Sequence, residues 1–160
     1  MIGMLLVLPS FARDFTYKYE GKTLTYTVID EQAKTCKTKS GGTYKAGNVV
    51  SGSLIIPSVA KDGETQYTVT ELGENAFYSC SNLASVIIPN SVTKIEYSAF
   101  RDCTSLISVE IPNSVTSIRL GAFYGCSRLT SVAIPTSVTS IDEDTFYGCS
   151  SLTSVALPPP

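Results

Sequence analysis

Residues 106–126 read LISVEIPNSVTSIRLGAFYGC, and this pattern recurs every 23 residues through the second half of the 160-residue chain. In each repeat, phenylalanine, cysteine, leucine and valine keep fixed places, and an isoleucine or leucine stands directly before a proline. The aligned positions are Phe77, Phe100, Phe123 and Phe146; Cys80, Cys103, Cys126 and Cys149; Leu83, Leu106, Leu129 and Leu152; and Val86, Val109, Val132 and Val155. A fixed period of this length indicates a solenoid, in which neighbouring units bury one another's apolar side chains.

Each unit of the repeat predicts two short extended pieces and one compact turn. Alternation over residues 83–88 predicts a strand whose valine and isoleucine point inward, and the proline after it ends the strand because it has no N–H to donate. Residues 91–95 form the second extended piece, and residues 98–103 a single helical or 3₁₀ turn. We therefore expect Phe100 and its equivalents to stack at about 4.8 Å, the spacing of neighbouring strands.

The first repeat is longer than the others. Residues 54–57 (LIIP) resemble residues 86–89 (VIIP), but the two prolines are 32 residues apart instead of 23. The nine extra residues lie around Ala60 to Gln66, and we expect them to bulge as a loop that turns at Asp62-Gly63.

The N-terminal part of the chain has a different pattern. Residues 1–12 are apolar, too short to span a bilayer, and end in the small-x-small sequence Ser10-Phe11-Ala12. This stretch predicts the remnant of an export signal without its basic start, and a buried N-terminal strand is the alternative. Residues 13–52 are predicted to form a cap, since two alternating stretches around Glu20-Gly21-Lys22 predict a β-hairpin. Turns are expected at Gly41-Gly42 and Gly47-Asn48. The cap shields a solenoid over residues 53–160.

Composition excludes several classes of function. The formal net charge is -2, so the chain has no basic field with which to hold nucleic acid or an anionic membrane. Histidine is absent, which excludes Ser-His-Asp and Cys-His catalysis and removes the commonest zinc ligand. We therefore expect a protein that is not an enzyme and that has no cofactor, no metal site and no membrane span.

The cysteines and one acidic cluster are the remaining candidates for chemistry. The four repeat cysteines are predicted to be buried free thiols, because side chains stacked in parallel fit disulfide geometry poorly. A zinc or iron–sulfur site is the weaker alternative. Cys36 stands among lysines, so a reactive or intermolecular thiol is the alternative there. Asp142-Glu143-Asp144 is interpreted as a solvated turn, with calcium binding or a glycosidase pair as alternatives.

The repeat L-x-S-V-x-I-P-x-S-V-T-x-I-x-x-x-A-F-x-x-C resembles the BspA-like leucine-rich repeats of bacterial surface proteins, over residues 53–158. The resemblance implies export or surface display, and adhesion to host matrix or plasma proteins or to other cells. The sequence departs from that pattern where Glu96, Arg119 and Asp142 replace the glycine that commonly follows Thr-Ser-Ile.

Two outward columns are the candidate binding residues. Tyr78, Arg101, Tyr124 and Tyr147 follow the buried phenylalanine, so we expect them to face outward as an aromatic stripe, with packing along the coil edge as the alternative. The second set lies on the outer face of the repeat sheet. The alternative to binding there is that the serine hydroxyls only form hydrogen bonds with one another. The residues of this second set are Ser85, Ile87, Ser108, Glu110, Ser131 and Ser154.

The sequence as a whole predicts a secreted or cell-surface module that binds protein ligands and serves in adhesion. A structural spacer between other domains is the alternative. The chain ends in three prolines, Pro158-Pro159-Pro160, and self-association through the C-terminal repeat edge is a further prediction.

Overall fold

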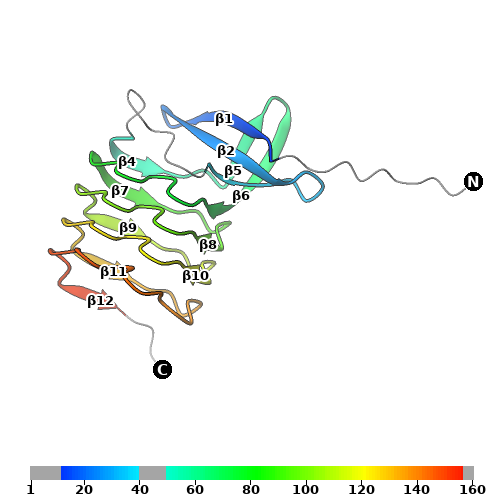
Figure 1. Cartoon of the computed structure of the whole chain (residues 1–160). Coiled ribbons are helices and arrows are strands. Elements are labelled where there is room, and N and C mark those ends of the chain that lie inside the picture. The colour runs from blue at the N-terminus through cyan, green and yellow to red at the C-terminus, as the bar shows by residue number, and fades with distance from the viewer. Residues whose placement is uncertain (1–11, 40–49, 157–160) are drawn as a thin grey trace, which may run out of the picture.

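A computed structural model describes residues 12–39 and 50–156 and shows stacked coils with the N-terminal strands at one end (Figure 1). Some of the predicted features lie outside the described residues. These are the export segment apart from Ala12, the two glycine turns within residues 40–49, and the final prolines.

Two sheets run along the solenoid. The described strands are β1 (Asp14–Tyr19), β2 (Lys22–Asp30), β3 (Thr35–Thr38), β4 (Gly52–Ile55), β5 (Val59–Asp62), β6 (Thr65–Leu72), β7 (Leu83–Ile87), β8 (Lys94–Ile95), β9 (Ser108–Glu110), β10 (Ser117–Ile118), β11 (Ser131–Ala133) and β12 (Ser154–Ala156). The five-stranded sheet has the order β12-β11-β9-β7-β4. The seven-stranded sheet has the order β1-β2-β3-β6-β8-β10, with β5 paired to β6.

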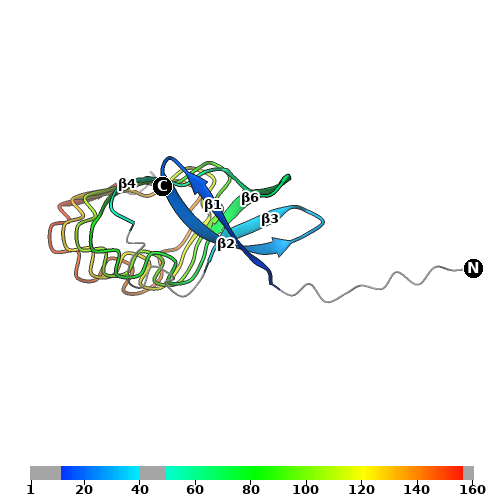
Figure 2. The ribbon, with the colours of Figure 1, turned by 90° about the horizontal axis from the view of Figure 1, so that it is seen from above.

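The coils stack in the register that the 23-residue period predicts. Val86 pairs with Val109 in parallel strands, and both side chains are buried. The rings of Phe77, Phe100, Phe123 and Phe146 stack with centroids 5.1, 5.4 and 5.6 Å apart and interplanar angles of 8°, 5° and 4°. The predicted stacking of successive phenylalanines is confirmed, and the eclipsed coils are visible from above in Figure 2.

The compact segment of each coil is a pair of hydrogen-bonded turns, so the predicted helical or 3₁₀ turn is corrected in detail. Arg101 N–H donates to Ser98 O three residues back at 3.1 Å, while the intervening Phe100 N–H donates to Ala122 O of the next coil at 2.8 Å. Ser98 and Asp102 have left-handed φ angles of 51° and 59°, which interrupt helical geometry. Within residues 12–39 and 50–156 no helix forms.

The repeat cysteines are buried free thiols, as predicted. Three of the four thiols donate to the carbonyl of the phenylalanine in the preceding coil: Cys103 Sγ to Phe77 O at 3.1 Å, Cys126 Sγ to Phe100 O at 3.1 Å and Cys149 Sγ to Phe123 O at 3.2 Å. Burial raises the pKa of Cys80 to about 11 and that of Cys126 to about 12. The repeat thiols therefore act as packing groups, and those of Cys103, Cys126 and Cys149 also bond to carbonyls of the neighbouring coil.

Cys36 is also buried, so the alternative of an accessible, reactive thiol is wrong. It lies in β3 between Val28 of β2 and Val69 of β6, and its side chain is 0% exposed. Burial raises its pKa to about 12 because the apolar surroundings disfavour the thiolate. Alternation along β3 turns the thiol inward, and the neighbouring Lys37 lies partly exposed on the opposite face.

The long first repeat contains a β-hairpin where a loop was expected. Val59 pairs with Thr68 and Asp62 with Thr65 in antiparallel register. The predicted turn at Asp62-Gly63 is in place, with Gly63 in the left-handed region at φ 58°. The extra residues are structured because strand pairing provides hydrogen-bond partners for backbone N–H and C=O groups. In a loop, those groups would have to bond to water.

The N-terminal cap is continuous with the solenoid. The predicted hairpin is confirmed as β1 and β2, with Tyr19 opposite Lys22. β3 then pairs antiparallel to β2 and parallel to β6, so it adds one more rung to the seven-stranded sheet, beside the coils in Figure 2. The cap thereby covers the apolar end of the first coil.

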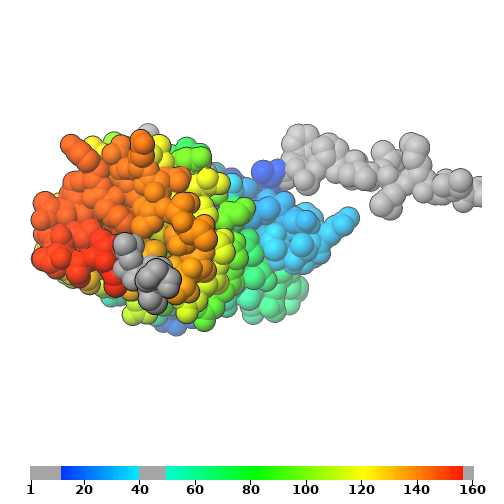
Figure 3. Space-filling view, turned by 90° about the horizontal axis from the view of Figure 1, so that it is seen from below, coloured from blue at the N-terminus to red at the C-terminus, as the bar shows by residue number. Residues whose placement is uncertain are grey.

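The last described coil is less well covered than the others. Phe146 and Leu152 are only partly buried, and Ile141 and Val155 are 37% and 36% exposed. Figure 3, seen from below, shows the orange and red side chains of this coil at the end of the solenoid. Self-association through this edge stays a prediction.

Candidate functional site

The outer face of the five-stranded sheet carries one row of serines. Strand pairing places Ser85 beside Ser108, Ser108 beside Ser131, and Ser131 beside Ser154. Ser53 extends the row, and its hydroxyl accepts a hydrogen bond from the Ser85 hydroxyl at 2.9 Å. The serines of β9, β11 and β12 are exposed, so the row is a polar surface open to a partner.

The second row on this face changes character along the solenoid. Ile55 pairs with Ile87, and Ile87 with Glu110; the two isoleucine residues are 41% and 43% exposed. Ala133 and Ala156 follow on β11 and β12. The alternation rule that selected Ile87 applies equally to Ile55, which was not singled out because its repeat is irregular.

A surface pocket adjoins this second row where β7 and β9 end. Its volume is about 380 Å³. It is lined by Ile87, Ile88, Pro89, Asn90, Glu110, Ile111 and Pro112. The prolines that end two successive strands supply its apolar wall, while Glu110 and Asn90 supply its polar groups. Ile87 and Glu110, both predicted from the sequence, are thereby brought to one site.

The aromatic column faces outward, as predicted, and part of it forms a continuous stack. The Arg101 guanidinium lies 4.2 Å from the Tyr124 ring centroid, and the Tyr124 and Tyr147 rings stack at 5.0 Å. Tyr78 and Tyr147 are 43% and 63% exposed, whereas Arg101 and Tyr124 are half-buried. The stacked faces of Tyr124 are covered, so Tyr124 offers a partner only its edge and hydroxyl, whereas Tyr147 is the most exposed side chain of the column.

The sequence interpretation missed two exposed apolar side chains on the turn side of the coils. Tyr97 and Leu120 occupy equivalent places in successive repeats and are 43% and 44% exposed. The Arg119 guanidinium lies 5.9 Å from the Tyr97 ring centroid. The only signal in the sequence was that apolar residues replace the glutamates of the equivalent positions, Glu74 and Glu143.

Asp142-Glu143-Asp144 begins an exposed turn between coils, as interpreted. Glu143 and Asp144 are exposed, and the Asp142 carbonyl accepts a hydrogen bond from the Thr145 hydroxyl at 2.7 Å. Across the part of the chain that the structure describes, no group of three or more metal-ligating side chains converges. The same residues include no helix long and apolar enough to cross a membrane.

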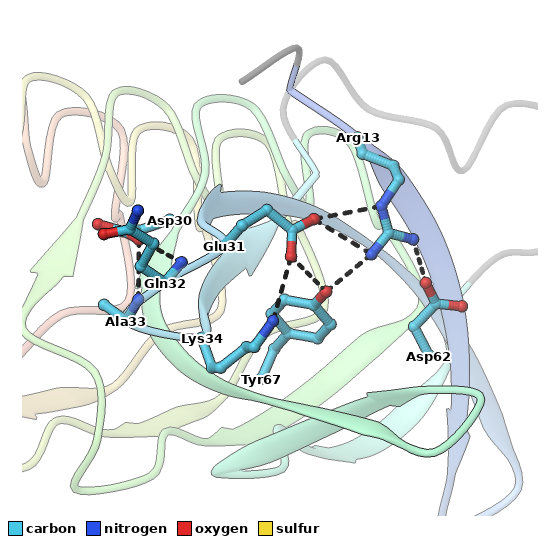
Figure 4. A network of polar contacts seen from close by, with 8 residues as sticks. All are labelled: Arg13, Asp30, Glu31, Gln32, Ala33, Lys34, Asp62 and Tyr67. Atoms are coloured by element: carbon cyan, nitrogen blue, oxygen red, sulfur yellow. Dashed lines mark hydrogen bonds and ion pairs between the residues drawn. The ribbon is translucent and has the colours of Figure 1, made fainter. Parts of the chain in front are cut away.

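A polar network that the sequence did not predict ties the cap together (Figure 4). The Tyr67 hydroxyl donates to Glu31 Oε2 at 2.8 Å and accepts from Arg13 Nη2 at 2.8 Å. Arg13 also pairs with Asp62 of the β5–β6 hairpin, and Lys34 lies 3.5 Å from Glu31. The network joins three segments distant in sequence, so its role is to hold the cap in shape.

Within the network, the pKa values of Glu31 and Tyr67 shift in opposite directions. The hydrogen bond from the Tyr67 hydroxyl, with those from Arg13, lowers the pKa of Glu31 below its ordinary value. The same hydrogen bond to Glu31, with burial, raises the pKa of Tyr67. Both shifts favour a charged Glu31 that accepts from a neutral tyrosine.

We expect Glu31 to make the stability of the cap depend on acid pH. Because the folded-state pKa of Glu31 is lowered, its contribution is present above the ordinary pKa of about 4.3 and is lost as pH falls through the lowered value. Glu31→Gln keeps an oxygen that can accept from Tyr67 but removes the charge. Urea midpoints of both proteins, followed from neutral to acid pH, should differ at pH 7 and converge in acid. A constant difference would contradict this assignment.

Comparisons with known proteins place the repeat in a family. Residues 64–160, more than half of the chain, match the BspA type leucine rich repeat region in six copies. No curated protein sequence matches the chain.

Solved structures share the fold at low identity. A leucine-rich repeat protein from Bacteroides capillosus is 27% identical with a TM-score of 0.72, and the match covers 90% of this chain and 99% of that protein. A leucine rich cell surface protein from Faecalibacterium prausnitzii is 26% identical with a TM-score of 0.63, covering 90% of this chain and 43% of that one. The Treponema pallidum leucine rich repeat protein, also 26% identical, has a TM-score of 0.63 over 89% of this chain and 72% of that one. With its in-register coils and stacked phenylalanines, the chain belongs to the BspA-type leucine-rich repeat family.

Proposed function

We propose that this chain is an extracellular or cell-surface module that binds a protein ligand and serves in adhesion. The observation that carries the proposal is the outer face of the five-stranded sheet, where exposed isoleucines, a carboxylate and a pocket adjoin a row of serine hydroxyls. Membership of the BspA-type family and the likeness to a cell surface protein of Faecalibacterium prausnitzii support the location. A host matrix or surface protein is the class of ligand that we expect.

The filled interior of the solenoid is an argument for a binding function and against a catalytic one. Core positions are filled by stacked apolar side chains, and burial raises the pKa of the cysteine thiols, which suppresses the nucleophilic thiolate. The exterior is therefore where this protein meets other molecules. Its extended sheet face is the kind of surface that repeat proteins offer to partners.

Binding is testable with an array of purified extracellular matrix and plasma proteins. The chain should bind at least one saturably, and Ile87→Ser or Tyr147→Ala should weaken that binding at least about tenfold, because exposed apolar and aromatic side chains anchor interfaces. Lys18→Ser, an exposed change on β1, is the control and should bind as the unaltered chain does.

The two variants separate the two candidate surfaces. An effect of Ile87→Ser alone assigns binding to the sheet face, and an effect of Tyr147→Ala alone assigns it to the aromatic column. If the array binds both variants as tightly as the unaltered chain, the proposed surfaces are wrong. If nothing binds, the proposal fails and a structural spacer is the better description.

A further inference from the structure

One row of the five-stranded sheet combines apolar and acidic character at a single place. Ile55 and Ile87 lie on neighbouring strands and are exposed, and Glu110 continues the row on the next strand. Glu110 is the only charged residue in β4, β7, β9, β11 and β12. Among the described residues its carboxylate has no ion-pair partner, although ion pairs occur in the cap, between β6 and β8, and in a turn.

The pocket extends this row at its edge. Ile87 and Glu110 line it together with Asn90 and two prolines, so an apolar wall and two polar groups border about 380 Å³ of space. This volume lies within the range of sites that hold a small group, roughly 300–1,000 Å³. It is large enough for one side chain of a bound segment.

We propose that Ile55, Ile87 and Glu110, with the adjoining pocket, bind an extended protein segment in which a branched aliphatic residue stands two positions from a lysine or arginine. This inference rests on the proposed binding function and names the chemistry of its ligand. Charge complementarity selects the cation, because Glu110 supplies an isolated negative charge on an otherwise uncharged face. The exposed isoleucines select the aliphatic side chain, since covering them removes apolar area from water.

The spacing of the patch fits such a segment. Side chains two residues apart on an extended chain lie about 7 Å apart on the same face. Neighbouring strands are about 4.8 Å apart, so the row from Ile55 to Glu110 spans about 10 Å. The row is about 3 Å longer than the spacing of the two ligand side chains. A lysine or arginine side chain is long enough to cover that difference and to place its charged end on the Glu110 carboxylate. An arginine there donates two parallel hydrogen bonds, which adds direction to the charge attraction.

The test uses short capped peptides and the full chain. Gly-Ile-Ser-Arg-Gly is the probe, with Gly-Ile-Ser-Glu-Gly and Gly-Ser-Ser-Arg-Gly as matched peptides that lack the cation or the aliphatic group. Titration followed by ¹⁵N–¹H chemical shifts should show saturable shifts at the ends of β4, β7 and β9 for the first peptide. The two matched peptides should bind more weakly, and added salt should weaken the first.

Protein variants isolate the carboxylate. Glu110→Gln should reduce affinity for the arginine peptide about two- to fivefold, the effect expected of an exposed ion pair. Glu110→Lys should reverse the preference toward the glutamate peptide. Glu143→Gln, which removes an exposed carboxylate from a turn, is the control and should leave binding unchanged.

Several outcomes overturn the inference. Equal binding of the arginine and glutamate peptides, shifts confined to residues away from β4, β7, β9 and the pocket, or no effect of Glu110→Gln would each do so. Self-association of the free chain that Glu110→Gln abolishes would assign the patch to a second copy instead. If an array protein is still bound while these peptides are not, the ligand chemistry is wrong and the binding function remains.

Discussion

Replacing Phe100 by alanine lowers the free energy of unfolding by about 3–5 kcal/mol, the cost of emptying a buried aromatic site. Phe100 is 0% exposed, and its ring stacks on Phe77 at 5.1 Å and on Phe123 at 5.4 Å. Removing it opens a cavity and breaks two ring contacts at once, and neither neighbouring coil can collapse into the gap without losing its own register. Urea unfolding, followed by circular dichroism, measures the change.

Position in the stack decides the size of this effect. Phe146→Ala is the matched control, because Phe146 is only partly buried and an adjacent ring is described only on its Phe123 side. Its cost should be clearly smaller. Phe100→Leu should also cost less than alanine, since leucine fills part of the cavity. Equal losses for Phe100→Ala and Phe146→Ala would show that stacking between coils does not govern stability.

Replacing Thr38 by valine costs about 1–3 kcal/mol, the penalty of leaving a buried donor without a partner. Thr38 is 0% exposed in β3, and its hydroxyl accepts the Gly73 N–H at 3.0 Å where the cap meets the first coil. Valine keeps the shape of threonine but removes the acceptor, while Gly73 stays buried. The loss therefore falls on the junction, and urea unfolding of the variant reports it.

Two variants separate the hydrogen bond from packing at this junction. Thr38→Ser retains the hydroxyl and loses one methyl group, so it should cost about 1 kcal/mol. Thr93→Val removes a hydroxyl that donates to Thr70 O at an exposed site, and should change stability by less than about 0.5 kcal/mol. If Thr38→Val were as mild as Thr93→Val, the hydrogen bond to Gly73 would contribute nothing to docking of the cap.

The repeated part of the fold was predictable because its contacts are periodic. Each apolar residue packs on its own counterpart one repeat away, so the 23-residue interval specified register, inward side chains and the stacking of Phe100 between its neighbours. The detail of the turns was not predictable. Left-handed φ angles at Ser98 and Asp102 depend on hydrogen bonds shared with the next coil, which no local propensity reports.

The irregular part of the fold depended on pairings between distant segments. The sequence predicted the hairpin of β1 and β2, since both strands and their turn are adjacent in the chain. It did not predict that Cys36 of β3 pairs with Val69 of β6, which buries the thiol, or that the extra residues fold as β5 and β6. The network around Tyr67 likewise requires three segments to meet.

The candidate surfaces divide in the same way. Strand alternation and repeat position were sufficient to predict the outward column that contains Tyr78 and Tyr147 and the outward serine row, and to include Glu110 among the candidates, but they missed Tyr97. The stack of Arg101 on Tyr124 and the pocket lined by two prolines became visible only when the coils were assembled.

By itself, the sequence determined a leucine-rich-repeat solenoid with a filled, unreactive core and a regular exterior, because the spacing of apolar residues is a property of the chain. Only the tertiary structure decided how the cap joins the first coil, that Cys36 is sealed from solvent, and where apolar and acidic side chains meet in one pocket. The physical reason is that these features depend on hydrogen bonds and packing between segments that are far apart in the chain. The repeat interval does not specify which of those segments come together.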